Sequence, residues 1–249
     1  MSSHSHPWFA TYSLGFQFLV GNNLRGTIPE EIGSVAFVDL EVLKLQDNYG
    51  LHGTIPSSIG SKLTHLTSLQ LGGNYLTGNI PDTFRQLTNL KLFNVSYNLL
   101  DGSLLEVNRG SIITYTGSIF WNMKQLVTLD LSRNLFDGWI NNKDLSFWAG
   151  ITGNGRTSDD DTVLRQFVVD DNMFLGVLPE ALELFSNSLQ VLSMSSNMFV
   201  ETLPTVYGKL TNLKVLQLHN NTMITGTIPT ELIQLSSLRK FVFLFLLYV

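Results

Sequence analysis

Apolar and polar positions alternate in a short unit that recurs along nearly the whole chain. The clearest copy carries Leu66, Leu69 and Leu71 before Asn74, and Leu76 after it. Leu69 and Leu71 are two residues apart, so both would point inward from one short strand. An amide side chain both donates and accepts hydrogen bonds, so the asparagine can satisfy backbone groups where the chain turns. The pattern predicts a short strand and a turn in each copy.

One asparagine marks each copy, and most of these asparagines lie about 24–26 residues apart. So short a unit cannot bury its apolar side alone, and its copies are expected to stack as a solenoid of parallel strands about 4.8 Å apart. The marking residues are Asn22, Asn48, Asn74, Asn98, Asn134, Asn172, Asn197 and Asn221.

Glycine and proline follow the asparagine at fixed places. Six of the seven prolines occupy the same position of the unit, as Gly78-Asn79-Ile80-Pro81 illustrates, and only Pro7 does not. Glycine permits backbone angles that other residues resist, and proline suits an extended segment. One copy has Glu201 where the others have glycine.

The unit L-x-x-L-x-L-x-x-N-x-L-x-G-x-I-P resembles the plant-type leucine-rich repeat of receptor-like kinases, receptor-like proteins and polygalacturonase inhibitors. The resemblance implies an α/β-type repeat solenoid, a right-handed superhelix with a parallel β-sheet on its concave face and irregular or 3₁₀ segments on its convex face. We expect a flexible tail over residues 1–13 and one solenoid over 14–249, with about eight full repeats and a partial ninth.

Two spacings between the asparagines are longer than the rest, at about 36 and 38 residues. They predict insertions near residues 106–116 and 142–162, after the two complete copies that lack the proline. In receptors of this family such insertions can contribute to ligand binding. A tolerated insertion is the alternative, and the acidic run Asp159–Asp161 is interpreted as a solvated loop.

Net charge and the absence of cysteine narrow the classes of function open to the chain. The net charge of −5 argues against a nucleic-acid partner, which needs a basic stripe, and the absence of cysteine excludes thiolate chemistry and disulfides. The N-terminus does not read as a secretory signal, whereas the family resemblance favours an extracellular or membrane-attached location, so localisation stays open.

The apolar segment Phe241–Val249 is too short to span a bilayer as a helix, which needs about 20 residues. We expect no bilayer span in this chain, and an exposed edge through which the last repeat could self-associate. A truncated chain and the start of a membrane segment remain open alternatives.

The residues between and after the strand leucines face outward from the concave sheet and form the candidate ligand-binding surface. Aromatic and arginine side chains often dominate interfaces, and an acidic group suits a ligand with basic groups. The candidates are Lys44, Gln46, Asp47, Tyr97, Asp130, Arg133, Asp170, Asp171 and His219.

No pattern for catalysis, a metal or a cofactor stands out. Asp170, Ser195 and His219 fall on three neighbouring strands, but a hydrolase triad requires the histidine between the other two, and here serine is in the middle. The sequence favours a non-catalytic recognition module for a protein, peptide or glycan. The alternative is an ectodomain fragment of a membrane receptor kinase involved in signalling.

Overall fold

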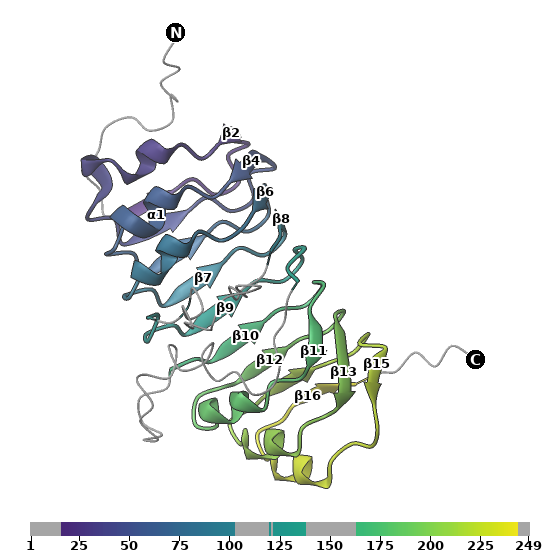
Figure 1. The fold of residues 1–249 in the computed structure, drawn as a ribbon. Coiled ribbons are helices and arrows are strands. Elements are labelled where there is room, and N and C mark those ends of the chain that lie inside the picture. Colours follow the sequence, from purple (N-terminus) through teal and green to yellow (C-terminus); the bar gives the residue numbers. More distant parts are fainter. Residues whose placement is uncertain (1–15, 103–119, 121, 138–162, 244–249) are drawn as a thin grey trace, which may run out of the picture.

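The chain forms a curved stack of repeats in the computed structural model, which describes residues 16–102, 120, 122–137 and 163–243 (Figure 1). The expected tail over 1–13, the insertions near 106–116 and 142–162, the acidic run and the last six residues lie outside the described residues.

A nine-stranded parallel sheet runs through the whole stack. Each copy of the repeat contributes one strand, and neighbouring copies pair in register, with Leu43 beside Leu69 and Leu69 beside Phe93. The strands are β1 (Phe16–Phe18), β3 (Val42–Lys44), β5 (Ser68–Gln70), β7 (Leu92–Asn94), β9 (Thr128–Asp130), β10 (Gln166–Val168), β12 (Val191–Ser193), β14 (Val215–Gln217) and β16 (Lys240–Val242).

Two smaller parallel sheets form on the far side of the asparagine turn. One contains β2 (Arg25–Thr27), β4 (Gly50–Thr54), β6 (Tyr75–Gly78) and β8 (Leu99–Leu100). The other contains β11 (Leu175–Val177), β13 (Met198–Thr202) and β15 (Met223–Thr225). The first residues of β6 and β8 lie beside the candidate site described below.

Short helices cover the convex side. Each of six prolines stands in extended conformation directly before a helix, as Pro81 does with a φ of −64°. Its ring sets this angle and its missing N–H is not needed there. The helices are η1 (Glu30–Gly33), η2 (Val35–Phe37), α1 (Ser57–Lys62), η3 (Asp82–Gln86), η4 (Glu180–Phe185), η5 (Thr205–Lys209) and η6 (Thr230–Gln234), all 3₁₀ except α1.

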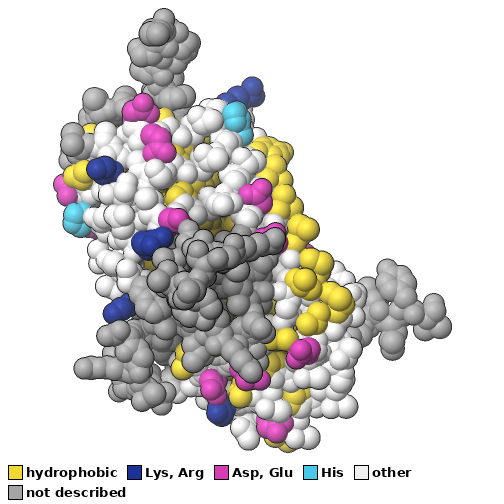
Figure 2. Space-filling view, viewed as in Figure 1, with side chains coloured by type: hydrophobic (Ala, Val, Ile, Leu, Met, Phe, Trp, Pro, Cys, Tyr) yellow, Lys and Arg dark blue, Asp and Glu magenta, His cyan; other side chains and the backbone are white. Residues whose placement is uncertain are grey.

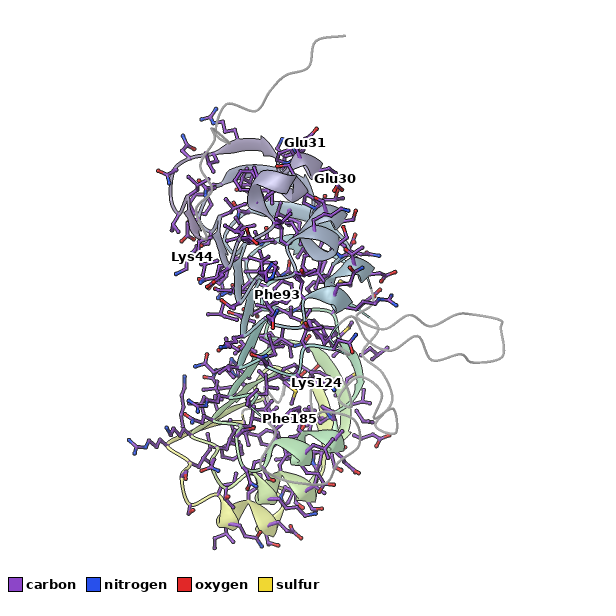
Figure 3. The ribbon with its side chains drawn as sticks, turned by 90° about the vertical axis from the view of Figure 1, so that its left-hand side faces the viewer. Glu30, Glu31, Lys44, Phe93, Lys124 and Phe185 are labelled. Carbon is purple, nitrogen blue, oxygen red and sulfur yellow. The ribbon has the colours of Figure 1, made fainter. Side chains whose placement is uncertain are left out.

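The core lies between the sheet and these helices. Leu69, Leu71 and Phe93 are fully buried, as the alternation predicted. Figure 3 shows Phe93 and Phe185 in the interior of the stack, Lys44 on the concave side of the sheet, and Glu30 and Glu31 on the opposite side. The solenoid with a concave parallel sheet and convex 3₁₀ segments is therefore confirmed.

Candidate ligand-binding site

The residue before each buried asparagine adopts a left-handed backbone. Its φ is 60° in Asp47, 56° in Tyr97, 54° in Arg133 and 52° in Asp171. Left-handed angles are uncommon outside glycine, and here they recur because each copy must turn sharply at the end of its strand. We call this line of residues the strand-end edge of the concave sheet.

Three side chains of the strand-end edge contact one another across consecutive strands. The Arg133 guanidinium carbon lies 4.5 Å from the centre of the Tyr97 ring, a cation–π contact. Arg133 Nε lies 3.2 Å from Asp171 Oδ2. All three side chains are exposed, so the row offers an aromatic face, a cation and an anion to a ligand.

A hollow opens beside this row, over the strand ends of β3, β5, β7 and β9. Its volume is about 640 Å³, and its wall includes the exposed aromatic residues Tyr49, Tyr75 and Tyr97. Amide and carboxylate groups of Gln46, Asp47, Gln70 and Asn94 supply the polar part of the wall.

The glycines Gly72 and Gly73 keep this hollow open. Both occupy outward positions that carry side chains on the neighbouring strands, Gln46 and Asp47 on one side and Ser96 and Tyr97 on the other. A Cβ added at Gly73 would come within 2.5 Å of Asp47 Oδ1, and the φ of Gly73 is 68°. A larger residue would therefore both clash and strain the backbone.

Figure 2 shows hydrophobic side chains gathered along the side of the molecule that β4, β6, β8 and β11 form. The starts of these strands supply exposed apolar residues, among them Tyr75 at β6, Leu99 at β8 and Leu175 at β11. The hollow thus lies where a polar sheet meets an apolar side.

The predicted site residues divide into groups in the structure. Gln46, Asp47, Tyr97 and Arg133 line the hollow. The Asp130 carboxylate accepts hydrogen bonds from the Ser132 N–H and Oγ at 3.0 and 2.7 Å. The other predicted residues face the concave side outside the hollow; they are Lys44, Asp170, Asp171 and His219.

Sequence reasoning missed Tyr49 and Tyr75. Both directly follow the repeat asparagine, a position that the strand columns did not include. The signal was present, because this position is aromatic or apolar in most copies: Tyr49, Tyr75, Leu99, Leu135, Met173 and Met198.

A polar network surrounds Asp170. Its carboxylate accepts hydrogen bonds from the Ser193 hydroxyl at 2.6 Å and from the Ser195 N–H at 2.6 Å. Ser195 Oγ in turn lies 2.9 Å from His219 Nδ1. Burial raises the pKa of Asp170, and the nearby Asp171 charge acts in the same direction. Serine separates the acid from the histidine, so this is not the geometry of a hydrolase triad.

Within the described residues, no cluster of three histidine or acidic groups could hold a metal ion. Across the same residues, no helix is long and apolar enough to cross a membrane.

Comparisons with known proteins agree with this architecture. A leucine-rich-repeat family model matches residues 38–100. The chain is 32% identical over 160 residues to Receptor-like protein 35 of Arabidopsis thaliana, covering 59% of this chain and 16% of that protein. It is 28% identical over 145 residues to Receptor-like protein EIX2 of Solanum lycopersicum, covering 56% and 13%. The matched part of the chain thus spans about a sixth of the length of the first relative and about an eighth of the second.

Solved structures give the same result for the fold. The ectodomain of the Arabidopsis receptor kinase HAESA, in complex with an IDA peptide hormone that is lengthened at its N-terminus, superimposes with a TM-score of 0.70 at 27% identity, covering 88% of this chain and 31% of that one. HAESA in complex with IDA and the co-receptor SERK1 gives 0.74 at 24% identity, covering 95% and 35%.

The repeat, the stacked sheet and the short convex helices define the fold as a leucine-rich-repeat solenoid, the fold of the solved receptor ectodomains. Its resemblance to plant receptor-like proteins and receptor-kinase ectodomains, expected from the repeat, is confirmed.

Proposed function

We propose that this chain is a recognition module that binds an extended peptide along the strand-end edge, with the hollow at Tyr97 and Arg133 as its anchor site. The observation that carries the proposal is the hollow itself. Three exposed tyrosines, a cation and several amides converge there on one open surface. Aromatic and arginine residues are the side chains that most often carry binding energy at interfaces.

The shape of the site favours an extended ligand over a compact one. The hollow is open, and it continues into the Tyr97, Arg133 and Asp171 row that crosses successive strands. An extended peptide running along the stack would contact one side chain of the row about every 4.8 Å. The complex of HAESA with a peptide hormone supports a peptide rather than a glycan.

A binding screen tests the proposal. Libraries of extended peptides and of glycans would be presented to the purified chain, and the affinity of the best binder measured by calorimetry. Tyr97→Ala and Arg133→Ala are each expected to weaken the binding of a peptide at least about fivefold, because each removes an anchor of more than about 1 kcal/mol.

Arg85→Ala is the matched control, since Arg85 lies on the convex helix η3 and pairs with Asp82 there. The affinity of the Arg85→Ala variant for the peptide should stay within about twofold of the affinity of the unchanged chain. Peptides whose affinity neither Tyr97→Ala nor Arg133→Ala changes would contradict the proposal. A screen that yields glycans alone would contradict it as well.

A second candidate, which extends the first, is that the module belongs to the ectodomain of a membrane receptor in signalling. It is favoured by relatives that are receptor-like proteins several times longer than this chain. Transcript sequence across both ends of the coding region tests it. Adjoining repeats with a membrane segment would support this role, and flanking stop codons with neither would remove it.

A further inference from the structure

Basic residues gather on the opposite edge of the concave sheet, where the strands begin. Lys91 directly precedes β7, Arg165 precedes β10, Lys214 precedes β14 and Arg239 precedes β16. All four side chains are exposed. We call this line of four the strand-start edge. It is basic although the chain carries a net charge of −5.

Hydrogen bonds align this edge from strand to strand. The Lys91 carbonyl accepts the N–H groups of Val127 and Thr128, and the Arg165 carbonyl accepts those of Gln190 and Val191. The same arrangement recurs at every step along the sheet, so residues directly before successive strands stand in one column. The column from β7 onward reads Lys91, Val127, Arg165, Gln190, Lys214 and Arg239.

From β5 onward this column contains no carboxylate, and its acidic residue, Glu41, stands directly before β3. None of the three residues before each strand from β5 to β16 is acidic. Among the described residues, no carboxylate forms an ion pair with any of the four cations, since the salt bridges there involve His65, Arg85, Arg133 and Lys209. Lys214 instead donates to the Gln190 side chain at 3.0 Å. The column therefore presents cations whose charge this part of the chain does not neutralise.

Three of the four cations alternate with neutral residues, whereas Arg239 directly follows Lys214 in the column. Lys91 and Arg165 are two strands apart, with Val127 between them, and Arg165 and Lys214 are again two strands apart, with Gln190 between them. Parallel strands lie about 4.8 Å apart, so successive cations stand about 9.6 Å apart.

This period selects a conformation for the partner. A polyproline II helix has three residues per turn and rises about 3.1 Å per residue, so every third side chain returns to the same face after about 9.3 Å. In a β-strand, side chains on one face repeat after about 6.7 Å and lose register with cations at this spacing. Carboxylates at every third position of a polyproline II segment would meet Lys91, Arg165 and Lys214 in turn.

We propose that the strand-start edge is a second binding surface, and that it takes an acidic peptide segment in polyproline II conformation with a carboxylate at every third residue. The surface is separate from the hollow. Lys91 stands directly before β7 and Tyr97 three residues after its end, so six residues separate them, about 20 Å if the chain were fully extended. This inference does not depend on the proposed function, because the two sites share no residue.

Fluorescence anisotropy with a labelled peptide of four Glu-Pro-Pro units tests this surface. The peptide is expected to bind the full chain at low salt and to bind more weakly as salt rises, since exposed charges are screened. Replacing all glutamates by glutamine should abolish the binding. A peptide with four glutamates at every second position should bind several-fold more weakly, because its charges do not match the period.

Matched variants locate the binding. The triple variant Lys91→Gln, Arg165→Gln and Lys214→Gln should weaken the Glu-Pro-Pro peptide about tenfold or more. The control Lys62→Gln, Arg85→Gln and Lys209→Gln removes the same charge from the convex helices and should stay within about twofold. Circular dichroism on both variants would check that each remains folded. Tyr97→Ala should leave this binding unchanged, which separates it from the proposed function.

Several results would overturn the inference. They are the absence of binding at low salt, equal binding of the glutamine peptide, equal or tighter binding of the period-two peptide, and an equal loss in the convex control. A labelled oligogalacturonate that binds while the acidic peptide does not would assign the edge to an acidic sugar polymer, and would equally refute the peptide.

Discussion

At the scale of single residues, the fold holds Glu201 at a backbone angle that is unfavourable for a residue with a Cβ. Glu201 stands at a repeat position that elsewhere holds glycine, and its φ is 70°. Equivalent glycines such as Gly78 and Gly226 have φ values of 74° and 83°. A left-handed backbone costs a residue with a Cβ about 1–2 kcal/mol. The repeat geometry therefore holds Glu201 in a strained conformation.

Glu201→Gly is expected to stabilise the protein by about 0.5–1 kcal/mol, because relief of strain exceeds the entropy that glycine adds to the unfolded chain. Urea denaturation would measure the change in the free energy of unfolding. Glu231→Gly, on the convex helix η6, is the control and should destabilise or leave stability unchanged. A less stable Glu201→Gly variant would show that no strain is stored there.

Asp170 should make stability depend on pH. Burial raises its pKa in the folded chain, so the folded state binds the proton more tightly than the unfolded state does. This group's contribution to stability is therefore greatest at acidic pH and falls as pH rises through the raised folded pKa. The substitution Asp170→Asn keeps the shape of the side chain but removes the group that titrates.

Urea denaturation of both proteins across mildly acidic to neutral pH would measure this effect. The free energy of unfolding of the unchanged chain, relative to that of Asp170→Asn, should decrease as pH rises through that window. A constant difference, or one of opposite slope, would contradict the raised pKa.

At the scale of the element, the asparagine turn joins each copy to the one before it. The Asn134 Nδ2 donates to the carbonyl of Val95 on the preceding copy at 3.0 Å and to those of Leu131 and Ser132 on its own. Its Oδ1 accepts the Leu100 N–H at 3.0 Å. Six other buried asparagines make similar bonds: Asn48, Asn74, Asn98, Asn172, Asn197 and Asn221.

Asn134→Ala is expected to destabilise the protein by about 2–4 kcal/mol, because it leaves several buried backbone groups without partners. Thermal and urea unfolding would both record the loss. Asn212→Ala, which removes an exposed amide with one bond to the Asn187 carbonyl, should cost less than about 0.5 kcal/mol. Similar losses in the two variants would mean that the buried ladder does not hold the copies together.

The elements were largely predictable because one physical unit repeats. The Leu69 and Leu71 alternation predicted the strand, and the extended segment expected at the prolines lies directly before six of the seven helices, which themselves were expected only from the family resemblance. The left-handed angle at Tyr97 and Arg133 was not predicted. Neither residue type favours that angle, and only the turn demanded by stacking explains it.

At the scale of the whole molecule, the last described repeat exposes large apolar side chains among charged ones. Ile233 is 91% exposed and Phe241 38% exposed, and no strand among the described residues pairs with the outer side of β16. An unpaired strand beside exposed apolar side chains favours association between copies. We predict that the chain self-associates through this end.

Sedimentation over a roughly hundredfold range of concentration would test this prediction, because association follows mass action. The average mass of the sedimenting species should rise with the concentration of the unchanged chain. Ile233→Glu should lower this average mass toward that of the monomer. Leu184→Glu, at an exposed position on the convex helix η4, is the control and should not. A chain that stays monomeric throughout would disprove the prediction.

The sequence by itself determined the architecture, because a unit that buries its leucines only against its own copies can do little except stack. It also identified the concave columns, including Tyr97, Arg133 and Asp47. Only the tertiary structure decided which of these residues share a surface: it opened a hollow above Gly72 and Gly73, brought Tyr49 and Tyr75 to its wall, and aligned Lys91, Arg165 and Lys214 in one column. Contacts between copies depend on the register and turn geometry of stacked strands, which no single copy specifies.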